Sequence, residues 1–230
     1  MSENQHPEQN GQDGRPNPYA QHAQAAAERA KAAAQDALGA ARRLITNPAG
    51  SIGEAHAGLG GDRILGVAIV FAVVAALCLA FASGSLSRAI MGAMMGGYGG
   101  GISFHFGAFL KASLMNLIGI AAVGGGILIM APLLGGRSNP ASALFTAATA
   151  VLPLALASLL ATLIGSILKN QLGGLIVMLL MLYGLCYLIM VLNAGLRQVA
   201  GINESRAALG TPTVLAIAML VMWLVGKLLS

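Results

Sequence analysis

Five stretches without a charged residue dominate the chain beyond residue 62. They cover residues 64–87, 112–136, 138–168, 170–196 and 207–226, and they are 24, 25, 31, 27 and 20 residues long. A helix needs roughly 20 apolar residues to cross the hydrocarbon core of a bilayer. Because lipid offers the backbone no hydrogen-bond partner, such a segment must be helical. The windows therefore predict an all-α fold, a polytopic membrane helix bundle.

The predicted membrane domain covers residues 63–230. Its five transmembrane spans are expected near residues 64–83, 112–134, 144–168, 172–193 and 211–229. Only 9% of the chain is charged, against about 25% in soluble domains.

Two regions precede the predicted membrane domain. Residues 1–19 are rich in Gln, Asn, Pro and Gly and are expected to be disordered. Residues 20–62 are expected to form an alanine-rich cytoplasmic helix and a linker. We expect solvent around this helix, and a partner-binding helix is the alternative.

A sixth window, residues 89–110, complicates the number of spans. It is uncharged, but seven of its 22 residues are glycine, and each glycine costs a helix about 1 kcal/mol relative to alanine. We therefore interpret it as a connector, with a short interfacial helix over 85–95 and a hinge at Gly99, Gly100 and Gly101. Six spans remain the alternative.

The distribution of basic residues predicts an orientation. With five spans and the N-terminal tail in the cytoplasm, six basic residues lie on the inner side (Arg42, Arg43, Arg63, Arg137, Arg197 and Arg206) and four on the outer side (Arg88, Lys111, Lys169 and Lys227). Positive charge favours the cytoplasmic side. The polar N-terminus has no pattern of a signal peptide. We expect a multi-pass protein of the bacterial inner membrane with a cytoplasmic N-terminus.

The residues that usually carry chemistry are sparse in the predicted membrane domain. Glu204 and His105 are its sole carboxylate and histidine from residue 63 onward. The serines at 113, 142, 158 and 166 have no histidine in the same expected layer, and no lysine follows the glycines as a phosphate-binding loop requires. The single basic residues form no nucleic-acid-binding patch. We expect no enzyme, no cofactor, no metal site and no nucleic-acid partner.

Two asparagines and one proline are the notable residues inside the predicted spans. Asn116 and Asn193 are candidate intramembrane polar residues, and Pro153 is expected to kink the third span. Neutral asparagines typically form hydrogen bonds between helices, but they also line the paths of permeation proteins. Both interpretations stay open.

The segment LNAGLRQVAGINESRAALGTPTVL, residues 192–215, joins the last two spans through a polar hinge. Arg197, Glu204 and Arg206 lie within ten residues of each other on the predicted cytoplasmic side. A local Arg–Glu pair is the simpler interpretation. The alternative is that these residues contact a lipid headgroup or a protein partner.

Three sequence blocks together resemble the Yip-domain family of Ypt/Rab-interacting membrane proteins, in its prokaryotic form. These are LITNP at 44–48, GGGISFHFGAFLKASL at 99–114 and GLRQVAGINESRAAL at 195–209. The resemblance covers roughly residues 40–230. It implies five helical spans, a cytoplasmic tail and no enzymatic activity. The alanine-rich tail departs from the acidic, aromatic tail of trafficking members.

These features together predict a non-enzymatic integral membrane protein. We expect it to act as a membrane scaffold, organiser or recruiter through its cytoplasmic tail and the packing of its helix bundle. Its expected partners are the lipid bilayer and either a second copy of the chain or another membrane protein. A permeation protein for a small solute or an ion, using Asn116, Asn193 and Pro153, is one alternative. An assembly factor for another membrane complex is the other.

Overall fold

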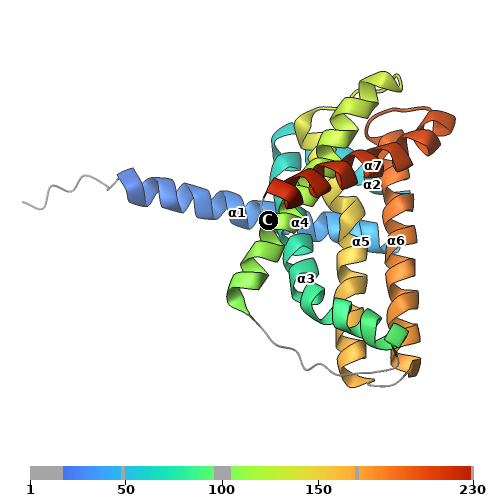
Figure 1. The fold of residues 1–230 in the computed structure, drawn as a ribbon. Helices are drawn as coiled ribbons and strands as arrows, with labels where there is room; N and C mark the ends of the chain where they lie inside the picture. Colours follow the sequence, from blue (N-terminus) through green and yellow to red (C-terminus); the bar gives the residue numbers. More distant parts are fainter. Residues whose placement is uncertain (1–17, 48–49, 96–104, 169–170, 229–230) are drawn as a thin grey trace, which may run out of the picture.

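The computed structural model describes residues 18–47, 50–95, 105–168 and 171–228, which form seven helices and no strand. The helices are α1 (Pro18–Thr46), α2 (Ile52–Leu59), α3 (Gly61–Met95), α4 (Phe106–Leu133), α5 (Pro140–Ile167), α6 (Gln171–Gln198) and α7 (Glu204–Leu228) (Figure 1). Five of them contain a segment long and apolar enough to cross a membrane: Arg63–Ser83, Phe106–Leu133, Pro140–Ile167, Leu172–Gln198 and Glu204–Leu228. The prediction of an all-α bundle with five candidate spans is confirmed, and the chain has the helices of a multi-pass membrane protein.

All five helices begin earlier than their predicted spans, by one residue in α6 and by three to seven residues in the others. At the start of α5, Asn139 occupies the N-cap and its Oδ1 accepts a hydrogen bond from the Ser142 amide at 2.8 Å. Pro140 follows at the first helical position, where its missing amide costs nothing. Hydropathy locates the apolar part of a span, whereas the cap decides where the helix begins.

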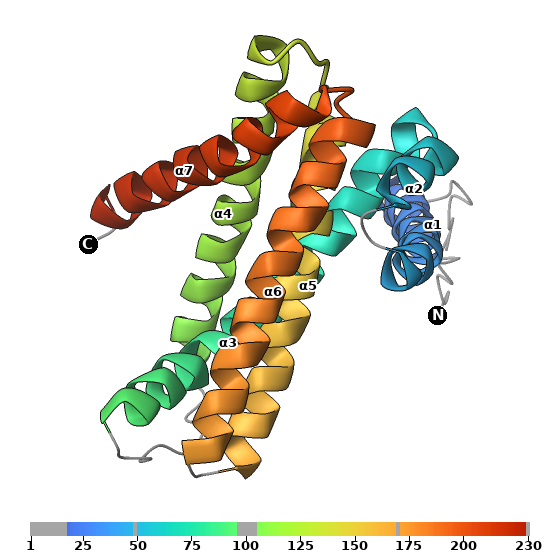
Figure 2. The same cartoon turned by 90° about the vertical axis from the view of Figure 1, so that its right-hand side faces the viewer.

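Helix α5 forms the centre of the bundle. It packs against α3, α4 and α6, and Figure 2 shows α5 and α6 side by side along their length. Its inward side chains are mostly small, and Phe145 is fully buried among them. A Cβ built on Gly184 of α6 would lie 2.8 Å from the Ala157 Cβ of α5. Small side chains therefore set the spacing between these two helices.

Helix α1 differs from the solvated helix that we expected, because its second half packs on the membrane domain. Ala37, Ala40 and Leu44 are buried on α1, and they follow Ala33 at helical spacing. A Cβ on Gly66 of α3 would lie 3.1 Å from the Ala33 Cβ, so the two helices approach closely. An ion pair between Asp36 and Arg63, 3.8 Å apart, adds a polar contact. Alanine alone gave no sign of this, since it is common on solvated helices too.

The expected linker between α1 and the membrane domain contains the eight-residue helix α2. Ile52 and Ala55 are buried on it. The Gly53 amide donates a hydrogen bond to Gln198 Oε1 of α6 at 2.9 Å. Helix α2 is thereby attached to the bundle.

Residues 85–95 are helical, as expected, but they belong to α3, which continues to Met95, and do not form a helix of their own. The candidate span within α3 ends at Ser83. The helical backbone gains one hydrogen bond for each added residue, and this favours extension of an existing helix over a new one. The predicted hinge at Gly99, Gly100 and Gly101 lies outside the described residues, as do residues 1–17 of the predicted disordered stretch 1–19. The last two residues of that stretch, Pro18 and Tyr19, already belong to α1.

Candidate functional site

Three chain segments far apart in sequence meet at one end of the bundle. The Arg137 amide, between α4 and α5, donates to the Ala200 carbonyl, between α6 and α7, at 2.8 Å. The Arg206 Nη1 atom donates to the Leu134 carbonyl at 3.3 Å. Helix α2 joins them through its bond from Gly53 to Gln198. We call this the polar end; it contains Arg137 of the connector between α4 and α5 and Arg206 of the first turn of α7.

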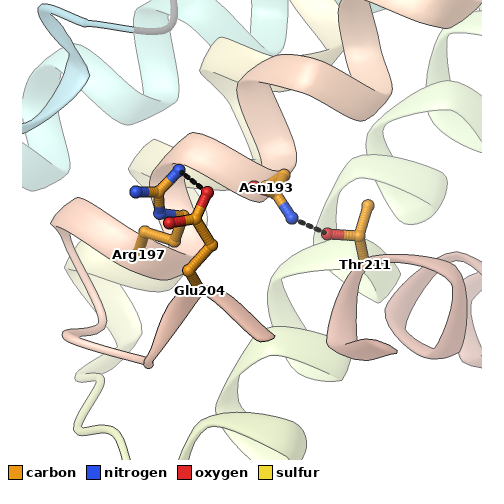
Figure 3. Close-up of polar contacts among 4 residues, drawn as sticks. All are labelled: Asn193, Arg197, Glu204 and Thr211. Carbon is orange, nitrogen blue, oxygen red and sulfur yellow. Dashed lines mark hydrogen bonds and ion pairs between the residues drawn. The ribbon is translucent and has the colours of Figure 1, made fainter. Parts of the chain in front are cut away.

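Arg197 and Glu204 form an ion pair across the turn between α6 and α7, with 3.0 Å between Nη1 and Oε1 (Figure 3). Their side chains are 43% and 73% exposed. Exposed pairs of this kind contribute about 0–1 kcal/mol. The third predicted contact residue, Arg206, is directed elsewhere, to the α4 carbonyl of Leu134. The structure therefore brings two of the three residues together.

Asn193 links α6 to α7. Its Nδ2 atom donates to Thr211 Oγ1 at 3.3 Å, and that hydroxyl donates to the Ala207 carbonyl at 2.9 Å (Figure 3). Asn193, Arg197 and Thr211 also line a cavity of about 520 Å³ between the two helices. A guanidinium and an amide side chain in one cavity wall can bind an anionic group such as a phosphate or carboxylate.

Asn116 lies in a different helix pair. Its Nδ2 atom donates to the Ala76 carbonyl of α3 at 3.3 Å. The structure therefore does not join Asn116 and Asn193 in one contact. Each asparagine makes a bond between neighbouring helices, an arrangement typical of helix packing in membranes.

Pro153 lies inside α5. Because proline has no amide hydrogen, the carbonyl of Thr149, four residues earlier, loses its usual helical donor. Thr149 and Pro153 both line a second, apolar cavity, which borders α1, α3, α5 and α6.

Sequence reasoning missed a histidine–serine contact at the polar end. His56 of α2 lies with its Nε2 atom 2.8 Å from Ser142 Oγ of α5, so the expectation that Ser142 has no histidine neighbour is wrong. The His56 ring also packs against Phe145, with the ring centroids 5.7 Å apart. Burial lowers the pKa of His56. A separation of 86 residues carries no motif that could have revealed the pair.

This pair is better suited to joining α2 and α5 than to catalysis. The Ser142 hydroxyl is already paired with the His56 ring, so the two side chains hold α2 against α5. Among the described residues, no group of three His, Cys, Asp or Glu side chains could hold a metal ion.

Comparison of the chain with protein-family models, with curated proteins and with solved structures found no match.

Proposed function

We propose that this protein is a non-enzymatic membrane scaffold that recruits a partner through α1. The observation that carries the proposal is the division of α1 into two halves. Its second half is docked on the membrane domain through Ala37, Ala40 and Leu44. Its first half extends beyond the bundle (Figure 1), and its described side chains between Ala23 and Ala32 are all exposed.

A projecting helix needs support, because short isolated helices are marginal in water. The docked half of α1 supplies a preformed helix from which the first half extends. High alanine content lowers the cost of this extension. The projecting half presents Glu28, Arg29 and Lys31 among alanines. Alternating charge around a flat, small-residue surface suits a partner helix with complementary charges.

The polar end supports a cytoplasmic location for α1. Arg137, Arg197 and Arg206 lie in or next to the two connectors that meet there, and Arg63 lies at the start of α3. An excess of arginine marks the cytoplasmic side of membrane proteins. We therefore place the N-terminus in the cytoplasm and the protein in the bacterial inner membrane.

Membership of the Yip-domain family is part of the same proposal. The five candidate spans and the N-terminal tail agree with what the resemblance implies. The docked, alanine-rich α1 suggests a partner other than a Rab GTPase.

Site-specific photo-crosslinking in intact cells tests recruitment. A photoreactive amino acid at Ala27, on the projecting half, is expected to form a discrete protein adduct. The matched control is the same amino acid at Leu220, an exposed apolar residue of α7, which is expected to react with lipid. Deleting residues 2–31 should leave membrane insertion unchanged and abolish co-purification of the adduct's protein. Equal co-purification with the truncated protein would show that α1 does not recruit it.

A further inference from the structure

An apolar groove lies along α1, where the docked half of this helix meets α3, α5 and α6. Its volume is about 500 Å³, it is open rather than enclosed, and its walls include Leu44, Phe71, Leu156 and Val191. The polar residues of its described lining are Thr149, Tyr183 and Tyr187, and no charged residue lines it there. A cavity of this size lies within the range of roughly 300–1,000 Å³ that is usual for small-ligand sites.

Thr149 gives this groove a specific polar group. The residue is only 3% exposed, and its Oγ1 atom has no hydrogen-bond partner among the residues that the structure describes. Serine and threonine in membrane helices usually satisfy their hydroxyl on a backbone carbonyl four residues earlier. Pro153 also deprives the Thr149 carbonyl of its helical donor. A buried polar group without a partner is costly, so a ligand that pairs with it gains free energy.

The place of the groove in the molecule indicates which ligand it meets. Three of its walls belong to candidate spans, so its open side faces lipid when the protein is in a membrane. Water does not fill an apolar cavity stably. The fourth wall is α1, with a buried apolar stripe and an exposed charged face. Helices of this kind lie at the boundary between headgroups and acyl chains, which is the level of the glycerol esters.

The charges next to the groove complement a phosphate. Arg42 and Arg43 are exposed on α1, and they lie between Ala41 and Leu44, which line the groove. A lipid with its acyl chain in the groove therefore has its phosphate near positive charge.

We propose that the groove binds one phospholipid. One acyl chain lies between α3, α5 and α6, and its ester carbonyl accepts a hydrogen bond from the Thr149 hydroxyl. This lipid site is independent of the recruiting role of α1.

Native mass spectrometry of the full-length protein, released from nanodiscs of phosphatidylethanolamine and phosphatidylglycerol, tests the site. Leu156→Trp fills the groove and is expected to remove one retained phospholipid. Leu220→Trp makes the same change on an exposed position of α7 outside the groove, and is expected to retain it. Thr149→Val keeps the side-chain shape and removes the hydroxyl, and is expected to weaken retention about fivefold.

Several results would overturn the proposal. Equal retention in the wild-type, Leu156→Trp and Thr149→Val proteins would exclude a phospholipid in the groove. Retention of a free fatty acid or another apolar molecule in place of a phospholipid would exclude the ester contact. If Leu156→Trp does not yield folded protein, the conservative Thr149→Val variant decides: retention equal to that of the wild type overturns the proposal.

Discussion

At the scale of single residues, a close contact between α5 and α6 depends on the absence of a side chain at Gly184. A Cβ there would lie 2.8 Å from the Ala157 Cβ and 3.1 Å from the Leu154 Cα. Gly184→Ala is expected to push α5 and α6 apart and to destabilise the protein by about 1–3 kcal/mol. Thermal unfolding in detergent measures this, as a fall of several degrees in Tm.

Gly125 of α4 offers the matched control, because a Cβ there would meet no atom within 4 Å. Gly125→Ala is expected to leave the Tm unchanged or to raise it, since alanine favours a helix by about 1 kcal/mol relative to glycine. If Gly184→Ala also leaves the Tm unchanged or raises it, the close contact at Gly184 does not limit the approach of α5 and α6.

His56 makes the attachment of α2 dependent on pH. Burial lowers its pKa below the usual value of 6.5, so the folded protein binds fewer protons at this group than the unfolded chain does. The free energy of unfolding therefore has its full value, as far as His56 is concerned, above pH 6.5. It decreases as the pH falls toward and through the lowered pKa, because the unfolded chain then binds the proton more readily. The Tm is therefore expected to fall between pH 7 and pH 5.

The variant His56→Gln should flatten this dependence, because glutamine does not titrate. His105→Gln, at an exposed histidine before α4, is the matched control and should keep the wild-type profile. A wild-type profile in His56→Gln would contradict the assignment to His56.

At the scale of elements, the docking of α1 on α3 is the feature that the sequence least predicted. Ala33 and Gly66 make the closest approach, with 3.1 Å between the Ala33 Cβ and a Cβ built on Gly66. This separation is slightly shorter than the Cβ spacing of about 3.5–4.5 Å in disulfides. In a background with both native cysteines replaced by alanine, the pair Ala33→Cys and Gly66→Cys should therefore form a disulfide on mild oxidation.

Gel mobility with and without a reductant measures this crosslink. The control pairs Gly66→Cys with Gln35→Cys, whose position on α1 is exposed and faces away from α3. The control is expected to remain reduced. Rapid crosslinking of both pairs would mean that α1 is loosely attached and not docked in one position.

The sequence predicted the five spans because the physical requirement is local. A stretch that must cross lipid excludes charge over about 20 residues, and this can be read in a single window. The docking of α1, the helix α2 and the contact between His56 and Ser142 have no such local requirement. Each depends on residues dozens of positions apart, and on side chains such as alanine that are equally suited to solvent and to a helix interface.

At the scale of the whole molecule, the polar end fixes the relative direction of the helices. Helices α4 and α6 end there, and α5 and α7 begin there, as the bonds from Arg137 to Ala200 and from Arg206 to Leu134 require. Helix α7 then crosses α4 obliquely, with Gly126 against Val214 and Gly119 against Met222. It diverges from α6 on the way (Figure 2). An α7 that crosses the membrane carries the C-terminus to the side opposite the polar end.

This arrangement predicts the result of a topology experiment. A reporter fused after Ser230 is expected on the outer side of the membrane. A cysteine introduced at Ser138, in the polar-end connector between α4 and α5, should react with a maleimide that cannot cross membranes only after the membrane is opened. Five spans require these two opposite results because an odd number of crossings separates the polar end from the C-terminus. A C-terminus on the same side as Ser138 would mean that α7 does not cross the membrane. A sixth span over residues 89–110 would reverse both results, with Ser138 on the outer side and the reporter on the inner side. Labelling at Lys111→Cys tests the sixth span directly, since that span would bring the start of α4 to the side of the N-terminus.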